Sequence, residues 1–252
     1  MSDFSGQSVL VTGASRGIGR AVARLFAALG ARVAVGYLAG RAAAEVTLAG
    51  LSGSGHILVR GDVGSPNGPA EIVRAAVQGL GGLDVVVNNA AVRGHHPIAT
   101  TDLETWRADW TRILAGNLSG PAEICFHAAR HMIEASRGGA IINVSSRGAF
   151  RGEPNMPAYG ASKAGLNSLT QSLALALGPH GILVAAVAPG FVQTEGTADR
   201  LAGPEGEGIR AQSPLGRVAT AEEVAEAILY LAGAPFTTGA ILDVNGASYL
   251  RT

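Results

Sequence analysis

The sequence predicts an α/β domain in which helices cover both faces of one doubly wound parallel sheet of about seven strands. Short runs rich in β-branched residues alternate with longer Ala/Leu-rich segments of helical period. The short runs are almost continuously apolar, as expected for strands that are buried on both sides. No internal repeat, charge block or Pro/Ser-rich linker divides the 252 residues, so we expect a single domain over 1–252.

The first half of the chain contains four of the expected strands, each a run of mainly Val, Ile, Leu and Ala. Ser65 and Pro66 have the character of an N-cap and a first-turn proline, so a helix is expected from there to about Leu80. In chain order the elements are a strand at 8–13 (SVLVTG), a helix at 19–29 (GRAVARLFAAL), and strands at 31–37 (ARVAVGY) and 55–61 (GHILVRG). The helix from Ser65-Pro66 to about Leu80 and a strand at 83–89 (LDVVVNN) follow.

The second half continues the alternation. Two helical stretches are expected between about Asp102 and Ala135. They are followed by a strand at 139–146 (GAIINVSS), a long helix at 158–177, a strand at 182–190 (ILVAAVAPG), a helix near 220–233 and a last strand at 239–244 (GAILDV). The segment 191–213 is rich in Gly and polar residues, and is either a plain connection or a mobile lid over a site.

Composition narrows the function classes. Hydrophobic residues make up 47% and charged residues 15% of the chain, as in globular proteins. The net charge of zero argues against a general nucleic-acid binder or a basic membrane-surface protein. Apolar runs are broken well before the roughly 20 residues of a membrane span, and no secretory signal is visible at the N-terminus. Cys125 is the only cysteine, which fits a reducing cytoplasm.

A glycine-rich loop, TGASRGIG (12–19), lies between the first expected strand and the first helix. Gly13 permits a tight turn, Gly17 lets backbone approach a diphosphate, and Gly19 lets helix and strand pack closely. The helix N-terminus then offers free N–H groups to phosphates. Glycine triplets also occur in ordinary turns, but this position favours dinucleotide binding.

The choice between the two nicotinamide dinucleotides rests on the end of the second strand. NAD-specific sites usually carry an acid there, whereas this chain has none at 36–38. Arg16 and Arg41 offer positive charge for a 2′-phosphate, or are simply solvated. We therefore favour NADP(H) over NAD(H). Asp62, in the sequence Gly61-Asp62-Val63, is expected either to accept a hydrogen bond from the adenine amine or to cap its own loop.

Tyr159 and Lys163 stand four residues apart in the long helix, and Lys163 is the only lysine of the chain. Residues at i and i+4 share one helix face. A tyrosine with a pKa near 10 is a poor proton-transfer group at neutral pH, and a nearby ammonium stabilises its phenolate. An ordinary helix with a packed tyrosine and a surface lysine is the alternative, which the uniqueness of Lys163 disfavours.

The glycine loop, NNAA at 88–91, Ser146 and Tyr159-x-x-x-Lys163 occur in one chain in this order. The set resembles the short-chain dehydrogenase/reductase family, in particular its branch of about 250 residues that includes 3-oxoacyl-[acyl-carrier-protein] reductases. The resemblance extends to Asn117 and to PLGRVATAEEVA (214–225), and implies a Rossmann fold. Two departures are Ala91, where the family usually has glycine, and the segment NGASYLRT, which lacks a double glycine.

The resemblance implies a catalytic set of Ser146, Tyr159, Lys163 and Asn117. Ser146 would bind the substrate oxygen, Tyr159 transfer the proton, Lys163 tune Tyr159 and hold the ribose, and Asn117 hold a water that links Lys163 to solvent. Cofactor contacts are expected at Gly13, Ser15, Arg16, Gly17, Ile18, Gly19, Tyr37, Asp62, Val63, Asn89, Ala90, Ala91, Tyr159, Lys163, Pro189, Gly190, Val192 and Thr194.

Other candidate residues carry weaker signals. Asn88 and Asn89 are expected to brace the strand end and the active-site helix. His95 and His96 lack a third ligand at a recognisable spacing, so no metal site is expected and they are interpreted as pocket-rim residues. Further pocket walls are expected at Phe150, Arg151, Met156, Phe191 and the segment 191–213. No GxSxG motif supports a hydrolase.

These patterns predict an NAD(P)(H)-dependent enzyme that interconverts a ketone and a secondary alcohol. A 3-oxoacyl thioester on an acidic carrier protein is the first substrate hypothesis, with Arg130 and Arg137 as a docking patch or as plain helix surface. A sugar, polyol or steroid-like alcohol is the alternative. A non-catalytic NADPH-sensing regulator is the alternative from another class. The resemblance also implies a homotetramer built on the middle helix and the 158–177 helix.

Overall fold

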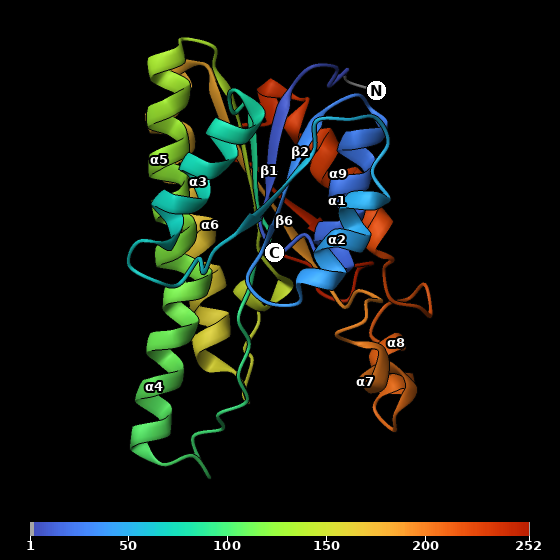
Figure 1. The fold of residues 1–252 in the computed structure, drawn as a ribbon. Helices are drawn as coiled ribbons and strands as arrows, with labels where there is room; N and C mark the ends of the chain where they lie inside the picture. Colours follow the sequence, from blue (N-terminus) through green and yellow to red (C-terminus); the bar gives the residue numbers. More distant parts are fainter. Residues whose placement is uncertain (1–2, 252) are drawn as a thin grey trace.

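The computed structural model describes residues 3–251. Its centre is a seven-stranded, all-parallel sheet with the order β3-β2-β1-β4-β5-β6-β7 (Figure 1). The strands are β1 (Ser8–Val11), β2 (Arg32–Tyr37), β3 (Ile57–Arg60), β4 (Val85–Asn88), β5 (Gly139–Val144), β6 (Ile182–Pro189) and β7 (Ile241–Val244). The order reverses between β1 and β4, which is where ligands bind in sheets of this kind. The predicted fold class is confirmed.

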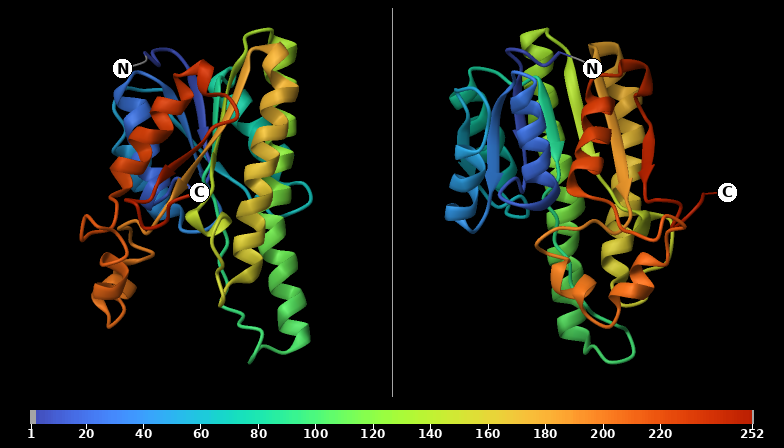
Figure 2. Two further views of the ribbon diagram at one scale, coloured as in Figure 1. Left: turned by 180° about the vertical axis from the view of Figure 1, so that it is seen from behind. Right: turned by 90° about the vertical axis from the view of Figure 1, so that its right-hand side faces the viewer.

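Helices cover both faces of the sheet (Figures 1 and 2). One face carries α1 (Gly17–Ala28), α2 (Arg41–Ala49) and α9 (Ala221–Ala232), and the other carries α3 (Gly68–Leu80), α5 (Gly120–Ala135) and α6 (Pro157–Leu177). The helix α4 (Leu103–Leu114) continues through a π-helical turn at Ala115–Ser119 into α5 and extends beyond the sheet. None of the described helices is long and apolar enough to cross a membrane.

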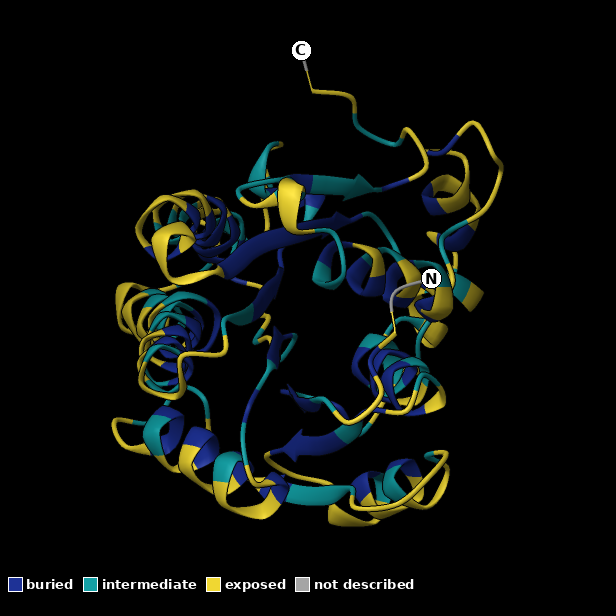
Figure 3. Cartoon of the chain, turned by 90° about the horizontal axis from the view of Figure 1, so that it is seen from above, coloured by how far each residue is buried: buried dark blue, intermediate teal, exposed yellow. Residues whose placement is uncertain are grey.

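Neighbouring residues of each central strand pack into different halves of the core. Val9 and Val11 contact the cluster that includes Phe26 of α1, whereas Leu10 between them contacts the cluster that includes Ile124 of α5. All five are fully or nearly fully buried. Figure 3 shows this burial along the strands, with exposed residues on the outer sides of the helices. Continuous apolar runs are therefore required because both sides of each strand are covered.

The structure corrects two element boundaries and adds one helix. The helix expected from Ser65-Pro66 begins instead at Gly68, because residues 65–68 form a turn in which the Ser65 hydroxyl accepts from the Gly68 N–H. The strand expected to reach Ser146 ends at Val144, and a 3₁₀ turn follows at Arg147–Ala149. The helix α2, an Ala-rich segment that starts after Gly40 in the left-handed region, is absent from the sequence-based prediction.

The segment 191–213 contains two short helices, α7 (Ala198–Ala202) and α8 (Gly206–Arg210). In Figures 1 and 2 they project beyond the sheet, on the side of its strands' carboxyl ends. Both ends of the segment are tied to the main body. Residue Val192 forms a parallel bridge with Ala219, and the Ser213 hydroxyl donates to the Gly246 carbonyl.

Candidate active site

The glycine loop is fixed to the end of β4 by backbone contacts. A Cβ atom on Gly13, whose φ is +64°, would lie 2.9 Å from the Cα of Ala90. The Asn89 amide donates to the carbonyls of Thr12 and Gly13. In return the Thr12 hydroxyl accepts from the N–H groups of Asn89 and Ala90. Asn89 thus braces the glycine loop rather than the active-site helix, and Thr12 is a positioning residue that the sequence reasoning missed.

The N-terminus of α1 holds an anion of the protein itself. The Gly17 N–H donates to Oε2 of Glu195 at 3.1 Å, and the Arg20 guanidinium binds Oε1 at 2.8 Å. A carboxylate here stands in for the diphosphate of a dinucleotide, since both are anions that accept from N–H groups at a helix N-terminus. The contact shows that this helix N-terminus accepts a carboxylate, and the diphosphate of the predicted dinucleotide carries the same sign of charge.

The residues expected around the adenosine half of a cofactor lie at the ends of β2 and β3. Tyr37 is buried, and no acid follows it. Arg16 is exposed and has no ion pair within residues 3–251, whereas Arg41 is paired with Glu45. Asp62 accepts from the Gly64 N–H, so its loop-capping role is observed. Arg16 thus offers an exposed guanidinium at this end of the site, and its charge also helps to lower the pKa of Glu195.

Tyr159 and Lys163 are both buried on the first turns of α6, at 6% and 2% exposure. Lys163 Nζ donates to the Val144 carbonyl at 2.8 Å and lies 5.8 Å from the centre of the Tyr159 ring. Burial by itself raises the pKa of Tyr159, but the charges of Lys163 and Arg93 and hydrogen bonds from Ser146 and Arg93 outweigh it and leave this pKa below its ordinary value. Burial also lowers the pKa of Lys163, against the opposing attraction of Tyr159.

Ser146 lies beside Tyr159 at the carboxyl end of β5. Its backbone is extended, and its hydroxyl oxygen accepts from the Gly148 N–H at 3.0 Å. That hydroxyl also contributes to lowering the pKa of Tyr159. Ser145 points elsewhere, with its hydroxyl donating to the Lys163 carbonyl. The structure thus brings the predicted Ser146, Tyr159 and Lys163 together.

Asn117 sits in the π-helical turn between α4 and α5 and is fully buried. Its side-chain oxygen accepts from the Val92 N–H at 2.6 Å, and its nitrogen donates to the Val92 carbonyl at 2.8 Å and to Ser162 at 3.2 Å. Pro121, four residues on, has no N–H, so the Asn117 carbonyl lacks the usual helical hydrogen bond. The side chain of Asn117 therefore holds the loop after β4 against α6.

The loop after β4 also contributes two residues that the sequence reasoning did not assign correctly. His96 is fully buried, not a rim residue: Nε2 accepts from the Ala158 N–H and Nδ1 contacts the Gly94 carbonyl at 3.0 Å. It caps the start of α6 next to Tyr159. Arg93, which had no assigned role, lies with its guanidinium carbon 5.4 Å from the centre of the Tyr159 ring. Among residues 3–251, no cluster of three or more His, Cys, Asp or Glu could hold a metal ion.

A chain of buried polar side chains runs beneath these residues. The Asn88 amide donates to Asn143 Oδ1 at 2.9 Å, and the Asn143 amide donates to the Thr170 hydroxyl at 2.9 Å. Asn88 therefore links β4 through β5 to α6, which agrees with its expected bracing role. Asn143 and Thr170 were not singled out, because neither stands in a recognisable motif.

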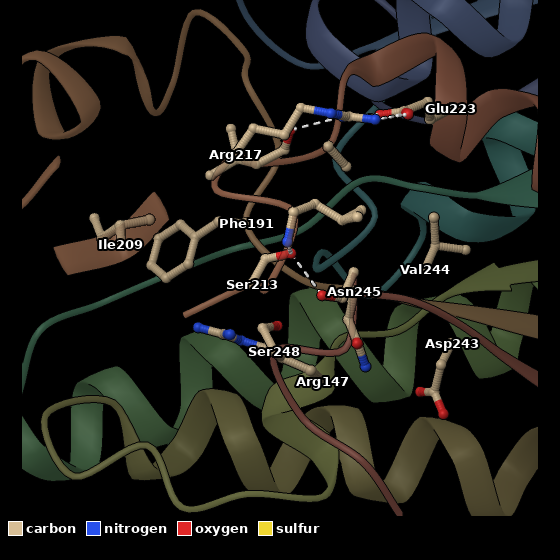
Figure 4. A pocket seen from close by; sticks show the side chains of 14 residues that line it. Arg147, Phe191, Ile209, Ser213, Arg217, Glu223, Asp243, Val244, Asn245 and Ser248 are labelled. Carbon is tan, nitrogen blue, oxygen red and sulfur yellow. Dashed lines mark hydrogen bonds and ion pairs between the residues drawn. The ribbon is translucent and has the colours of Figure 1, made fainter. Parts of the chain in front are cut away.

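A pocket with about 220 Å³ of free space opens beside the ends of β5, β6 and β7 (Figure 4). Phe191 and Arg147 line it, with the Arg147 guanidinium 5.0 Å from the centre of the Phe191 ring. Arg147 also donates to Gln212 at 2.6 Å, which connects the turn after Ser146 to the 191–213 segment. Of the other expected walls, Phe150 stacks on Tyr249, and Met156 packs against the small cluster around Tyr159.

The proposed docking patch for an acidic carrier protein is not supported. Arg130 lies near the C-terminal end of α5, and Arg137 lies in the connection from α5 to β5. Both positions are therefore at the amino edge of the sheet, opposite Ser146, Tyr159 and Lys163. Arg137 is also paired with Asp84 at 3.1 Å, and Arg130 with Glu134 at 3.4 Å.

Comparisons with known proteins identify the family of the chain. The family model described as enoyl-(acyl carrier protein) reductase matches residues 13–247. The chain is 38% identical to an L-rhamnose 1-dehydrogenase (NAD(P)(+)) of Sphingomonas sp., over 100% of this chain and 99% of that protein. It is 41% identical to a cis-4-hydroxycyclohexanecarboxylate dehydrogenase of Sinomonas cyclohexanicum, over 96% of each. It is 34% identical to a 3-oxoacyl-[acyl-carrier-protein] reductase of Synechocystis sp., over 98% of each.

A solved structure extends the likeness to three dimensions. The promiscuous reductase LugOII, which catalyses keto-reduction at C1 during lugdunomycin biosynthesis, superposes with a TM-score of 0.88. The two chains are 34% identical, and the match covers 99% of this chain and 100% of the other.

Proposed function

The chain belongs to the short-chain dehydrogenase/reductase family and is a nicotinamide-dependent alcohol dehydrogenase or ketone reductase, and from that premise we propose that Tyr159 is its general acid and base. The observation that carries this proposal is the environment of Tyr159. Burial should raise the pKa of its hydroxyl, yet the adjacent cations and hydrogen-bond donors lower it. A tyrosine tuned in this way exchanges a proton near neutral pH more readily than a free one.

Each remaining residue of the set has a defined task. The bound dinucleotide supplies or accepts the hydride at the substrate carbon. Ser146 donates a hydrogen bond to the substrate oxygen and orients it, and Tyr159 gives its proton to that oxygen in reduction or removes it in oxidation. Lys163 stabilises the Tyr159 phenolate at each turnover. The Lys163 ammonium also has donors for the ribose hydroxyls, since only one of its bonds is to Val144.

We propose that Asn117 serves proton relay through its main chain. Both side-chain atoms of Asn117 are engaged with Val92 and Ser162. Its carbonyl, for which Pro121 supplies no N–H at i+4, is the group that we propose accepts from a water of the relay.

We propose NADP(H) as the preferred cofactor and residues 13–19, 62–63, 89–91 and 189–194 as the binding loops. The support is the exposed Arg16 beside the glycine loop, together with the lack of an acid after β2. A 2′-phosphate would gain a charge-assisted contact there. Titration of the protein with NADPH and NADH, each in wild-type and Arg16→Gln forms, tests the preference; an equal loss for both cofactors would contradict it.

For the substrate we propose a small cyclic secondary alcohol and its ketone. The support is the likeness to a rhamnose dehydrogenase and a hydroxycyclohexanecarboxylate dehydrogenase at 38% and 41% identity. The 3-oxoacyl thioester is the second candidate, supported by the 34% likeness to a carrier-protein reductase. The location of Arg130 and Arg137 argues against carrier docking through them.

We further propose a homotetramer in the cytoplasm, with 191–213 as a substrate lid. Large apolar side chains are exposed on the two helices expected at the interface, namely Phe126 on α5 at 62% and Leu175 on α6 at 83%. Exposed aromatic and leucine side chains of this size favour burial between copies. Sedimentation of the wild type and of a Phe126→Glu variant tests the assembly.

The experiment that tests the proposed reaction is the substitution Tyr159→Phe. Removing the hydroxyl should lower kcat for reduction of cyclic ketones by about 10²- to 10⁴-fold, the usual contribution of general acid catalysis. Binding of NADPH should persist, since the glycine loop is untouched. Unchanged turnover in this variant would refute Tyr159 as the general acid and base, whereas a wild type that binds NADPH and reduces no ketone would favour the sensing regulator.

A further inference from the structure

Arg93 places a second cation at the proton-transfer group. Its guanidinium carbon lies 5.4 Å from the centre of the Tyr159 ring, and its charge is one of the causes that lower the pKa of the Tyr159 hydroxyl. Ser146 approaches the same oxygen. The substrate oxygen must reach Ser146 and Tyr159, so Arg93 borders the space where a substrate reacts. Its side chain is exposed, and a ligand that enters from solvent can meet it.

The backbone that carries Arg93 is held firmly. On one side, Val92 exchanges two hydrogen bonds with the Asn117 side chain. On the other, the His96 N–H donates to the Asn155 carbonyl at 2.9 Å. The Arg93 carbonyl itself accepts from the Arg112 guanidinium at 3.4 Å. A cation on a braced loop is preorganised, which reduces the entropy that a bound ligand would otherwise have to offset.

The charge of Arg93 is not neutralised by the protein. Within residues 3–251 no ion pair joins it to Asp or Glu, while other arginines such as Arg20 and Arg112 are paired. The acid beside this loop, Asp109, is the partner of Arg112. The other charged group at Tyr159 is Lys163, which is also positive. The reaction space therefore has an excess of positive charge that an anionic ligand would complement.

We propose that Arg93 recognises an acidic group on the substrate, so that the enzyme acts on hydroxy acids and keto acids in preference to neutral alcohols and ketones. A guanidinium binds a carboxylate through two parallel N–H donors, which fixes the orientation of the molecule as well as its position. The inference rests on the proposed function and specifies its substrate class. Arg93 is then a specificity residue, and Tyr159, Ser146 and Lys163 remain the reacting set.

A role limited to tuning Tyr159 is the competing explanation, because a cation beside the phenolate also favours its charged form. The two roles differ in what they discriminate. Tuning of the pKa of Tyr159 affects turnover of every substrate alike and shifts the pH dependence of kcat. Recognition separates acids from their neutral analogues at constant pH.

The test compares matched substrates in four proteins. The substrates are 3- and 4-oxocyclohexanecarboxylate and the corresponding neutral carboxamides, with NADPH. The proteins are the wild type, Arg93→Gln, Arg93→Lys and, as a charge-matched control, Arg74→Gln on the exposed side of α3. For at least one pair the wild type should favour the acid in kcat/KM by about 10- to 100-fold, the usual range for a charge-assisted bond. Arg93→Gln should remove most of this preference by raising KM for the acid. Arg93→Lys should keep part of the preference, and Arg74→Gln should keep all of it.

A wild type that treats acid and amide alike in both pairs overturns the inference. The inference is also overturned if Arg93→Gln lowers kcat/KM equally for the acid and the amide and shifts the pH dependence of kcat. That result would mean that Arg93 only tunes the pKa of Tyr159. Calorimetric binding of cyclohexanecarboxylate, which has no carbonyl to reduce, provides a readout independent of turnover. Binding that Arg93→Gln weakens at least 10-fold supports the acid site even if no ketone is reduced, whereas no difference between variant and wild type counts against it.

Discussion

Glu195 occupies the anion site of the glycine loop, and its removal should tighten cofactor binding. Its carboxylate accepts from the Gly17 N–H and pairs with Arg20. A diphosphate that binds at the N-terminus of α1 must displace it. The substitution Glu195→Gln keeps the shape of the side chain and removes the competing charge.

The size of the effect follows from the exposure of the contact. The Glu195 side chain is 51% exposed, so its ion pair with Arg20 is worth about 0.2–1 kcal/mol. A negative charge at a helix N-terminus adds about 0.3–1 kcal/mol. Together these give about 0.5–2 kcal/mol, or about a 2- to 30-fold decrease in the Kd of NADPH. The difference should shrink as salt is added, because exposed charges are screened.

The assay is a fluorescence titration with NADPH at low and high ionic strength. Glu222→Gln is the matched control, since Glu222 lines the same depression but makes no contact with Gly17 or Arg20 among those described for the chain. Hydrogen bonds to Glu195 and the charge of Arg20 lower the pKa of the Glu195 carboxyl. The carboxylate is therefore charged and competes fully at neutral pH. Acidification should end the competition only at a pH below the ordinary pKa of a glutamate. An unchanged or weaker affinity in Glu195→Gln would refute the competition and indicate that Glu195 contacts the bound cofactor.

Three further outcomes are expected. Lys163→Arg should reduce kcat by about 100-fold or more, because the wider guanidinium does not fit the buried position of Lys163 at the Val144 carbonyl; near-normal kcat would contradict this. Thr220→Ala should cost about 1 kcal/mol in chemical denaturation at pH 7, because it removes the N-cap of α9. Its capping partner Glu223 has a pKa lowered from 4.5 to about 2, chiefly by Arg217, so the carboxylate's contribution persists at neutral pH and is lost as pH falls from about 4.5 through about 2. Burial raises the pKa of the Cys125 thiol to about 12, so thiol reagents should label Cys125 only after unfolding. Rapid labelling of the native protein would contradict the burial of Cys125.

The parts of the site that could be predicted from sequence are those encoded by local spacing. The glycine loop, Ser146, Tyr159 and Lys163 each stand at a strand end or on one helix face, where chain position determines location. The seven strands were equally accessible, because burial on both sheet faces imposes continuous apolar runs, whereas the helix α2 was missed.

The missed contributors depend on contacts between distant segments. Thr12 contacts residues 89–90, and His96 contacts Ala158, across gaps of about 77 and 62 residues. No periodicity reports such pairs. Arg93 was overlooked because a single arginine in a loop has no distinguishing pattern until the fold places it over Tyr159. The assignment of His96 to a rim was wrong for the same reason, since a histidine's burial depends on what packs over it.

The solitary lysine gives this enzyme a built-in spectroscopic reporter. Lys163 is the only lysine side chain in the chain, and it is buried against Val144 and Tyr159. Protein grown with lysine isotopically enriched at its terminal carbon and nitrogen would give one side-chain ammonium signal, with no overlap and no assignment problem. Ionisation of Tyr159, arrival of a dinucleotide and arrival of an acidic substrate each change the electric field at this ammonium, so a single resonance can follow the titration of the catalytic centre directly.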